Sequence, residues 1–310
     1  MSSNPFKILI AGMGGVGGYY GGLLAHHYSP VPEVEVYFLA RGEHQKAIRQ
    51  NGLHLVCHKG DFLVHPDQVT DRPAELGFCD LVIYCVKSYH LESVTNQVAT
   101  NIGDKTVVLT LLNGINTADK LKALLPQSEV MKGFVYVNSH RMGPGEIHQR
   151  GIDPLLNFGP FDKQLAPVHK RIEQIFDNAG ISVKLHEDIH PPMWEKFILV
   201  GSTASLTAFY GEGVREISKY PDFGQIVYEI YNLASAKGIA LAGDLPEKLI
   251  HKIKNFKPGV KSSMQIDFES GRQTELELFT GYVVKESERL GLEAPFANKY
   301  YTALKQRLNG

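Results

Sequence analysis

Lys196 is a candidate for proton transfer. The sequence around it predicts a helix, because apolar side chains recur at the spacing i, i+4, i+7 and i+11. These side chains are Met193, Phe197, Val200 and Ala204. Lys196 lies within about 70° of the centre of this apolar stripe on a 3.6-residue wheel, where partial desolvation lowers the pKa of an ammonium group. Such a group can protonate a developing alkoxide; the alternative is a flank lysine whose ammonium reaches water.

Asn113 and Glu275 are two further polar residues at the ends of expected elements. Asn113 follows the apolar strand expected over 107–111. At such a strand-to-helix turn an asparagine can contact a ligand or simply suit the turn conformation. Thr274 and Glu277 have the spacing of a capping box, so we expect a helix to begin at Glu275. The helix dipole favours a carboxylate in that first turn, which alone explains an acidic residue there.

Residues 8–17, ILIAGMGGVG, have the types and spacing that bind a pyrophosphate. They predict a short buried strand, a glycine turn and the start of a helix whose N–H groups face phosphates. Gly12 permits the tight turn, Gly14 lets the backbone approach the pyrophosphate, and Gly17 lets the helix pack against the strand. The alternative is a glycine turn with a structural role only. The residues expected at the dinucleotide are Gly12, Met13, Gly14, Gly15, Val16 and Gly17.

Two cations follow expected strands and suit the charged parts of a dinucleotide. The run 34–39, VEVYFL, predicts a second strand, and Arg41 follows it where an NAD-dependent protein usually carries Asp or Glu. A guanidinium suits the 2′-phosphate of NADP, so the sequence favours NADP over NAD. The alternative is a solvated surface arginine. Lys87 follows the buried strand expected over 80–86, where it can contact cofactor phosphate or ribose or extend into water.

Two domains are expected from the length and from a change of pattern along the chain. The 310 residues suffice for two hydrophobic cores. Short apolar runs dominate first, and residues 131–159 are expected to extend the same sheet as antiparallel strands or hairpins; helical periodicity dominates afterwards. The predicted fold class is α/β. A Rossmann-type dinucleotide-binding domain over 1–187 is expected to precede a helical C-terminal domain over 188–310.

The overall composition argues against several classes of function. The formal net charge is −1, so no global field favours nucleic acid or an anionic membrane. The apolar run 197–210 is too short and too rich in Ser, Thr and Gly to span a bilayer, and the first residues show no apolar signal region. The 13 histidines show no metal-ligand spacing, and neither do Cys57, Cys79 and Cys85. Unpaired cysteines fit a reducing cytoplasm.

The order and spacing of these motifs resemble those of the ketopantoate reductase (2-dehydropantoate 2-reductase) family over essentially the whole chain. The motifs are GMGGVGG at the first turn, LAR ending at Arg41, VK ending at Lys87, NG at Asn113, WEK ending at Lys196, SSM around Ser263 and GRQTE ending at Glu275. The resemblance implies an NADP-binding Rossmann domain and an all-helical second domain that binds the substrate and carries catalytic residues. It also implies reduction of 2-dehydropantoate to (R)-pantoate, on the route to pantothenate and coenzyme A.

The resemblance further implies roles for individual residues. Lys196 matches the general acid that acts on the carbonyl oxygen. Asn113 matches an asparagine that touches cofactor and substrate, and Glu275 matches a carboxylate near the lysine and the nicotinamide ribose. Ser263 matches a serine that contacts the substrate. The matched positions on the cofactor side are Arg41, Lys87 and Ser139, the last through its backbone.

Departures from the family's pattern bear on the substrate. Val200 and Ala204 stand where the family commonly has asparagines, one and two helical turns after the lysine, and Thr280 stands where it often has another. Without the first two amides, hydrogen bonds to the hydroxyl and carboxylate of pantoate are lost. The expected function is NADPH-dependent reduction of 2-dehydropantoate by a cytoplasmic monomer or homodimer. The alternatives are reduction of a more apolar 2-oxo acid, another hydroxy-acid or opine-type dehydrogenase, and a non-catalytic NADP-responsive regulator.

Overall fold

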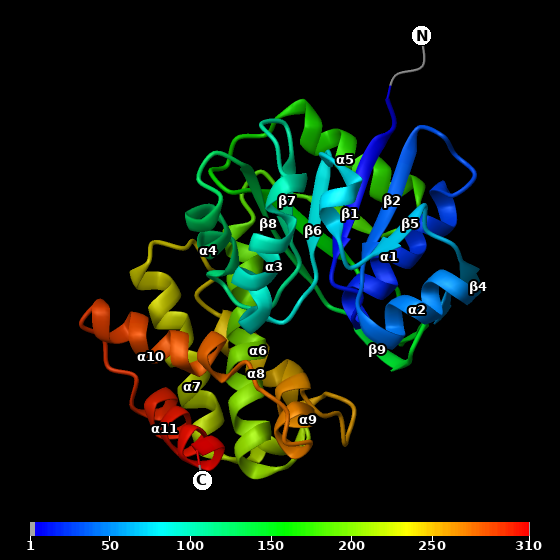
Figure 1. The fold of residues 1–310 in the computed structure, drawn as a ribbon. Coiled ribbons are helices and arrows are strands. Elements are labelled where there is room, and N and C mark those ends of the chain that lie inside the picture. The colour runs from blue at the N-terminus through cyan, green and yellow to red at the C-terminus, as the bar shows by residue number, and fades with distance from the viewer. Residues whose placement is uncertain (1–3, 310) are drawn as a thin grey trace. The chain divides into compact units, whose positions relative to one another are not determined.

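The computed structural model describes residues 4–309 and is drawn as a ribbon in Figure 1. Contacts within the chain divide it between Ile189 and His190 into two compact units. The N-terminal unit combines a largely parallel sheet with helices. The described part of the C-terminal unit consists of helices and turns. The fold class is therefore the one that the sequence predicts.

An eight-stranded sheet forms the centre of the N-terminal unit, in the order β12-β11-β8-β7-β6-β1-β2-β5. Its strands are β1 (Phe6–Ala11), β2 (Val34–Leu39), β5 (Gln68–Thr70), β6 (Leu81–Tyr84), β7 (Val107–Thr110), β8 (Glu129–Val135), β11 (Leu156–Pro160) and β12 (Val183–Leu185). Neighbouring strands are parallel except β8 and β11, which are antiparallel. The chain passes from β2 on one side of β1 to β6 on the other. The sheet therefore has a topological switch point beside β1, where ligands bind in folds of this kind.

Helices cover both faces of this sheet, which explains why its strands are almost continuously apolar. The helices are α1 (Gly15–Tyr28), α2 (Gly42–Asn51), α3 (Leu91–Val98), α4 (Thr117–Leu124) and α5 (Pro167–Asn178). Successive side chains of β1 point to opposite faces. Ile8 and Ile10 enter the core that includes α1 and α5, whereas Leu9 and Ala11 enter the core that includes α3 and α4. Both cores hold β1, and with it the start of the glycine turn, in place.

A second, four-stranded sheet has the order β4-β3-β10-β9. Its strands are β3 (Leu53–Cys57), β4 (Gly60–Val64), β9 (Asn138–Gly143) and β10 (Glu146–Arg150). The expectation that 131–159 extends a single sheet is thus wrong in part, because only β8 and β11 join the main sheet. The middle of the segment packs on α1 instead, where a Cβ on Gly18 would lie 2.4 Å from Cγ1 of Ile147. The missing side chain of Gly18 makes room for this second sheet.

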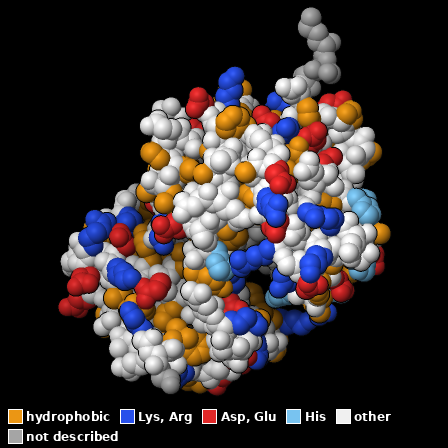
Figure 2. Space-filling model, viewed as in Figure 1, with side chains coloured by type: hydrophobic (Ala, Val, Ile, Leu, Met, Phe, Trp, Pro, Cys, Tyr) orange, Lys and Arg blue, Asp and Glu red, His pale blue; other side chains and the backbone are white. Residues whose placement is uncertain are grey.

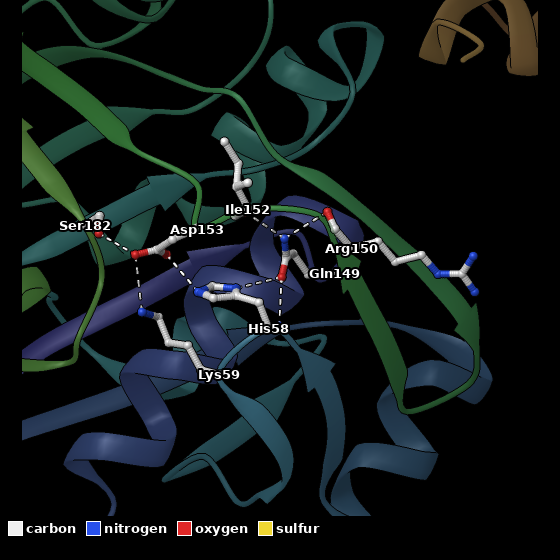
Figure 3. A network of polar contacts seen from close by, with 7 residues as sticks. All are labelled: His58, Lys59, Gln149, Arg150, Ile152, Asp153 and Ser182. Atoms are coloured by element: carbon white, nitrogen blue, oxygen red, sulfur yellow. Dashed lines mark hydrogen bonds and ion pairs between the residues drawn. The ribbon is translucent and has the colours of Figure 1, made fainter. Parts of the chain in front are cut away.

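A polar network joins segments that are distant in sequence (Figure 3). Asp153, in the loop after β10, accepts a hydrogen bond from the hydroxyl of Ser182 at 2.5 Å. Its carboxylate also lies 3.3 Å from Nζ of Lys59 and 3.0 Å from Nε2 of His58. Oε1 of Gln149 lies 2.9 Å from Nδ1 of the same histidine. The network links the β3–β4 turn, β10 and the residue before β12.

Helix α6 (His190–Tyr210) is the central element of the C-terminal unit and contacts α7, α9, α10 and α11. The other helices are α7 (Pro221–Ala236), α8 (Leu245–Lys254), α9 (Ser263–Glu269), α10 (Thr280–Arg289) and α11 (Pro295–Asn309), with short 3₁₀ turns at Glu216–Lys219 and Leu276–Leu278. The pattern of a single apolar stripe understates the burial of α6. Trp194, Ile198 and Leu206 lie outside that stripe and are also buried, since neighbouring helices surround α6.

The helix expected to begin at Glu275 begins instead at Thr280, after a single 3₁₀ turn. The capping box is absent because Glu277 has other partners. Its carboxylate accepts hydrogen bonds from the hydroxyl of Tyr301 and from Nζ of Lys285, both at 2.6 Å. The capping-box prediction is therefore wrong, and Glu275 occupies the N-cap position of the 3₁₀ turn without a side-chain cap.

Among residues 4–309, every helix is either too short or too polar to cross a bilayer. The face shown in Figure 2 carries acidic and basic side chains interspersed, consistent with the formal net charge of −1.

Candidate active site

The glycine turn leaves an open cradle between β1 and α1. Gly12 has a φ of +108°, and a Cβ on it would lie 2.6 Å from Cγ1 of Val86. A Cβ on Gly17 would lie 1.9 Å from the carbonyl oxygen of Gly12, so the helix packs directly on the strand end. A Cβ on Gly14, in contrast, would meet no atom of the described residues within 4 Å. Two glycines are thus required by the fold, while the space over Gly14 is open.

The N-terminus of α1 suits an anion. Gly14 is its N-cap residue, no side chain caps the helix, and its first turn holds no acidic residue. The N–H groups of the first turn and the positive end of the helix dipole therefore face the cradle. Met13 is 4% exposed and belongs to the core, so it can offer only its backbone, while Val16 is partly buried. These features fit a dinucleotide pyrophosphate.

Ser139 of β9 holds the turn in position. Its hydroxyl donates a hydrogen bond to the carbonyl oxygen of Gly15 at 2.6 Å. A Cβ on Gly15 would lie 2.0 Å from the carbonyl oxygen of Ser139, so the two backbones are in close contact. The side chain of Ser139 is therefore engaged with the turn itself.

The strand order brings the other residues expected at the cofactor to one edge of the sheet. Strands β2, β1, β6 and β7 are parallel neighbours, so their carboxyl ends meet. Arg41 follows β2 and is the N-cap residue of α2, Lys87 follows β6, and Asn113 lies in the loop after β7. Arg41 is exposed, and its guanidinium makes no ion pair with the residues that the structure describes. Lys87 and Asn113 are partly buried.

Lys196 and Glu275 come together in the C-terminal unit. Lys196 is 7% exposed and Glu275 is 5% exposed. Burial disfavours the charged amine and lowers the pKa of Lys196 to about 8, although the charge of Glu275 opposes this shift. An amine with such a pKa can both hold and release a proton near neutral pH, as a general acid must.

Ser263 is the first residue of α9 and is exposed. The preceding Ser262 is the N-cap residue and accepts a hydrogen bond from the N–H of Gln265 at 3.1 Å. The hydroxyl of Ser262 also lies 2.7 Å from that of Thr207 on α6. This pair attaches the start of α9 to the helix that carries Lys196. The motif SSM thus contains one serine that serves the fold and one that faces outward.

Val200 and Ala204 differ in their surroundings. Val200 is partly buried, whereas Ala204 is 1% exposed. A side chain at position 200 is therefore more accessible to a ligand than a side chain at position 204.

Sequence spacing gives no sign of His44, which contacts the turn between β9 and β10. His44 lies in the first turn of α2, and its Nδ1 accepts a hydrogen bond from the N–H of Gly145 at 2.9 Å. The two residues are 101 positions apart, so only the fold reveals the contact.

Within residues 4–309, no three His, Cys, Asp or Glu side chains are grouped as a metal site requires. Burial raises the pKa of the Cys79 thiol to about 12 and also raises the pKa of Cys85. Neither thiol therefore has the lowered pKa of a reactive cysteine.

Comparison with known proteins identifies the family. The model "Ketopantoate reductase PanE/ApbA" matches residues 8–163, and "Ketopantoate reductase PanE/ApbA C terminal" matches residues 188–308. The structure of 2-dehydropantoate 2-reductase from Porphyromonas gingivalis is similar at 32% identity, with a TM-score of 0.85, over 97% of this chain and 99% of that one. A 2-dehydropantoate 2-reductase of Nostoc is 25% identical over 315 residues, covering 97% of this chain and 95% of the relative.

A further structure shows how widely the fold is used. D-Mandelate dehydrogenase, solved with NADH and anilino(oxo)acetate, has a TM-score of 0.83 at 22% identity, over 98% of this chain and 100% of that one. At this identity the likeness concerns the fold alone. The two family models, in contrast, cover most of the sequence. The chain belongs to the ketopantoate reductase family, whose members are oxidoreductases that act on CH–OH groups.

Proposed function

We propose that this protein reduces the carbonyl group of a 2-oxo acid with NADPH, and that 2-dehydropantoate is its substrate. The observation that carries the proposal is the buried Lys196, whose pKa is lowered to about 8 beside Glu275. Membership of the family supplies the reaction class. The proposed setting is pantothenate and coenzyme A biosynthesis, in the cytoplasm, by a monomer or homodimer.

Reduction of a carbonyl group adds one hydride to carbon and one proton to oxygen. The nicotinamide cofactor, when bound, supplies the hydride. Nζ of Lys196 donates the proton to the carbonyl oxygen as negative charge develops there, and the amine is left neutral. Glu275 favours the protonated amine before the transfer. Asn113 orients the carbonyl group by hydrogen bonding, and Ser263 binds a polar group of the substrate.

The N-terminal unit supplies the cofactor subsites in this proposal. The backbone over Gly14 and the first turn of α1 bind the pyrophosphate, supported by the open cradle and the uncapped helix. Lys87 binds the phosphate or ribose region. Arg41 binds the 2′-phosphate that distinguishes NADP from NAD, supported by its position after β2 and its unpaired guanidinium among the described residues.

A second substrate class is favoured by one observation. Val200 is partly buried one helical turn after Lys196, where an amide would hydrogen-bond the hydroxyl or carboxylate of pantoate. An apolar side chain at this position suits a 2-oxo acid with an apolar substituent instead. The second candidate is therefore NADPH-dependent reduction of a more apolar 2-oxo acid by the same residues.

A panel of 2-oxo acids tests both candidates. The protein is assayed with NADPH and with NADH against 2-dehydropantoate, 2-oxoisovalerate and benzoylformate, and loss of the reduced nicotinamide is followed by absorbance. The proposal predicts turnover with NADPH, with the highest kcat/KM for 2-dehydropantoate. A highest kcat/KM for one of the other two acids supports the second candidate. Cofactor binding without turnover of any 2-oxo acid would refute both and favour a regulator.

A further inference from the structure

Strand β9 runs from the glycine turn to α2 and so connects two parts of the cofactor region. At one end, the hydroxyl of Ser139 bonds the carbonyl oxygen of Gly15 at 2.6 Å. Beyond the other end, the N–H of Gly145 donates to Nδ1 of His44 at 2.9 Å. A Cβ on Gly145 would lie only 3.1 Å from Cβ of Ala47, so this turn packs against α2. Figure 1 shows β9 and α2 side by side in the N-terminal unit.

The pairing of β9 with β10 fixes the face on which Arg141 lies. Arg141 is opposite Ile147, and Ser139 is opposite Gln149. Residues directly opposite in an antiparallel pair, and residues two apart on one strand, share a face of the sheet. Ile147 packs on Gly18, so this shared face is the one toward α1. Arg141 is therefore carried on the α1 side of β9, between the glycine turn and α2.

The positive charge of Arg141 acts on His44 in the first turn of α2. Together with burial, which is the larger effect, it lowers the pKa of His44. His44 comes three residues after Arg41, so the region near the start of α2 holds two guanidinium groups. Both arginines are exposed, and neither pairs with a carboxylate in the described part of the chain. The acidic residue of this turn, Glu43, is 2.7 Å from Lys46.

Two cations near His44, neither paired with a carboxylate among the described residues, suit a doubly charged anion. In dinucleotide-binding folds the residue after the second strand meets the adenosine ribose, beside the glycine turn. We propose that Arg141 is a second cation of the 2′-phosphate subsite and that, together with Arg41, it determines the preference for NADPH over NADH. This inference rests on the cofactor assignment in the proposed function and is independent of the substrate.

The mononucleotides 2′,5′-ADP and 5′-AMP test the subsite without any turnover. Their dissociation constants are measured by calorimetry for the wild type, Arg41→Ala, Arg141→Ala and the double variant. Arg141→Ala is expected to weaken 2′,5′-ADP by about tenfold or more, the effect of losing a charged hydrogen bond. Its affinity for 5′-AMP is expected to stay within about twofold of wild type, because only the phosphate on the ribose is concerned.

Arg150→Ala is the matched control. Arg150 is an exposed arginine of β10, in the same small sheet, and Figure 3 shows its side chain extending away from the polar network. Its loss changes the net charge equally, so a general effect of charge would appear there too. Melting temperatures of all variants show whether each one is folded.

The outcomes separate this inference from the proposed function. If Arg41→Ala weakens 2′,5′-ADP and Arg141→Ala does not, the role of Arg141 is wrong and the cofactor assignment stands. If Arg141→Ala weakens both mononucleotides equally, Arg141 does not recognise the 2′-phosphate. If the wild type binds both mononucleotides equally well, neither arginine forms a 2′-phosphate subsite, and NADP specificity fails as well.

Discussion

The carboxylate of Glu275 acts on the buried ammonium group of Lys196, and both residues belong to the C-terminal unit. The two side chains are 5% and 7% exposed. Removal from water is the larger effect on the amine and lowers the pKa of Lys196 to about 8, whereas the carboxylate limits the decrease. Burial and the charge of Glu275 thus have opposite effects on the pKa of the proposed proton donor.

The rate of carbonyl reduction should depend on the protonation of Lys196. Only the protonated amine can donate, so kcat for reduction should be level below about pH 8 and fall about tenfold per pH unit above it. Oxidation of the hydroxy acid with NADP needs the neutral amine, so its kcat should rise through the same pH range. The measurement is a pair of pH profiles at saturating substrates. Profiles that are flat across this range would contradict the assignment.

Glu275→Gln should shift those profiles toward lower pH. The change removes the charge that supports the ammonium form, so desolvation acts on Lys196 without opposition. Glu277→Gln is the matched control, because Glu277 is half exposed and bonds Tyr301 and Lys285. The control should leave the midpoint unchanged. Equal shifts in the two variants would show that Glu275 has no special influence.

Two glycines of the turn should respond differently to alanine. Gly14→Ala should keep the wild-type melting temperature, since its Cβ meets no described atom within 4 Å, but should weaken NADPH binding by about tenfold or more. Gly17→Ala should lower the free energy of unfolding by at least about 2 kcal/mol, because its Cβ would overlap the carbonyl oxygen of Gly12. Thermal unfolding and NADPH titration measure both. A Gly14→Ala variant that binds NADPH normally would place the pyrophosphate elsewhere.

Val200→Asn should move specificity toward 2-dehydropantoate. Val200 is only partly buried and therefore partly accessible, so an amide introduced at this position can reach a ligand. The ratio of kcat/KM for 2-dehydropantoate to that for 2-oxoisovalerate should rise about tenfold. Ala204→Asn should mainly destabilise the fold, because Ala204 is 1% exposed and the larger side chain has no space. An unchanged ratio in a folded Val200→Asn variant would mean that residue 200 does not face the substrate.

Local sequence patterns were sufficient to predict an element of the fold where one physical requirement determines the residues of that element. Strand β2 spans Val34–Leu39, as its apolar run predicts, because a strand covered on both faces must be apolar almost throughout. The turn after β1 was predictable because only glycine tolerates a φ of +108° at Gly12. Helical periodicity placed Lys196 at the flank of an apolar stripe but left open whether its ammonium reaches water. The burial of Lys196 follows from the helices that surround α6, which the pattern did not reveal.

Contacts between distant segments could not be predicted in the same way. The alternation in 131–159 indicates strands but not their partners, so the separate sheet of β9 and β10 was missed. The spacing of Thr274 and Glu277 indicates a capping box, yet Tyr301 and Lys285 bind the glutamate instead. The position of Arg141 near α2 likewise depends on tertiary structure.

Lys196→Ala tests the central claim most directly. The measurement is kcat for reduction of the best 2-oxo acid at saturating NADPH, together with the dissociation constant of NADPH for the same variant. Loss of the general acid should reduce kcat by about 10² to 10⁴, while NADPH binding remains within about twofold of wild type. A Lys196→Ala variant that turns over as fast as the wild type would show that the proton comes from another group.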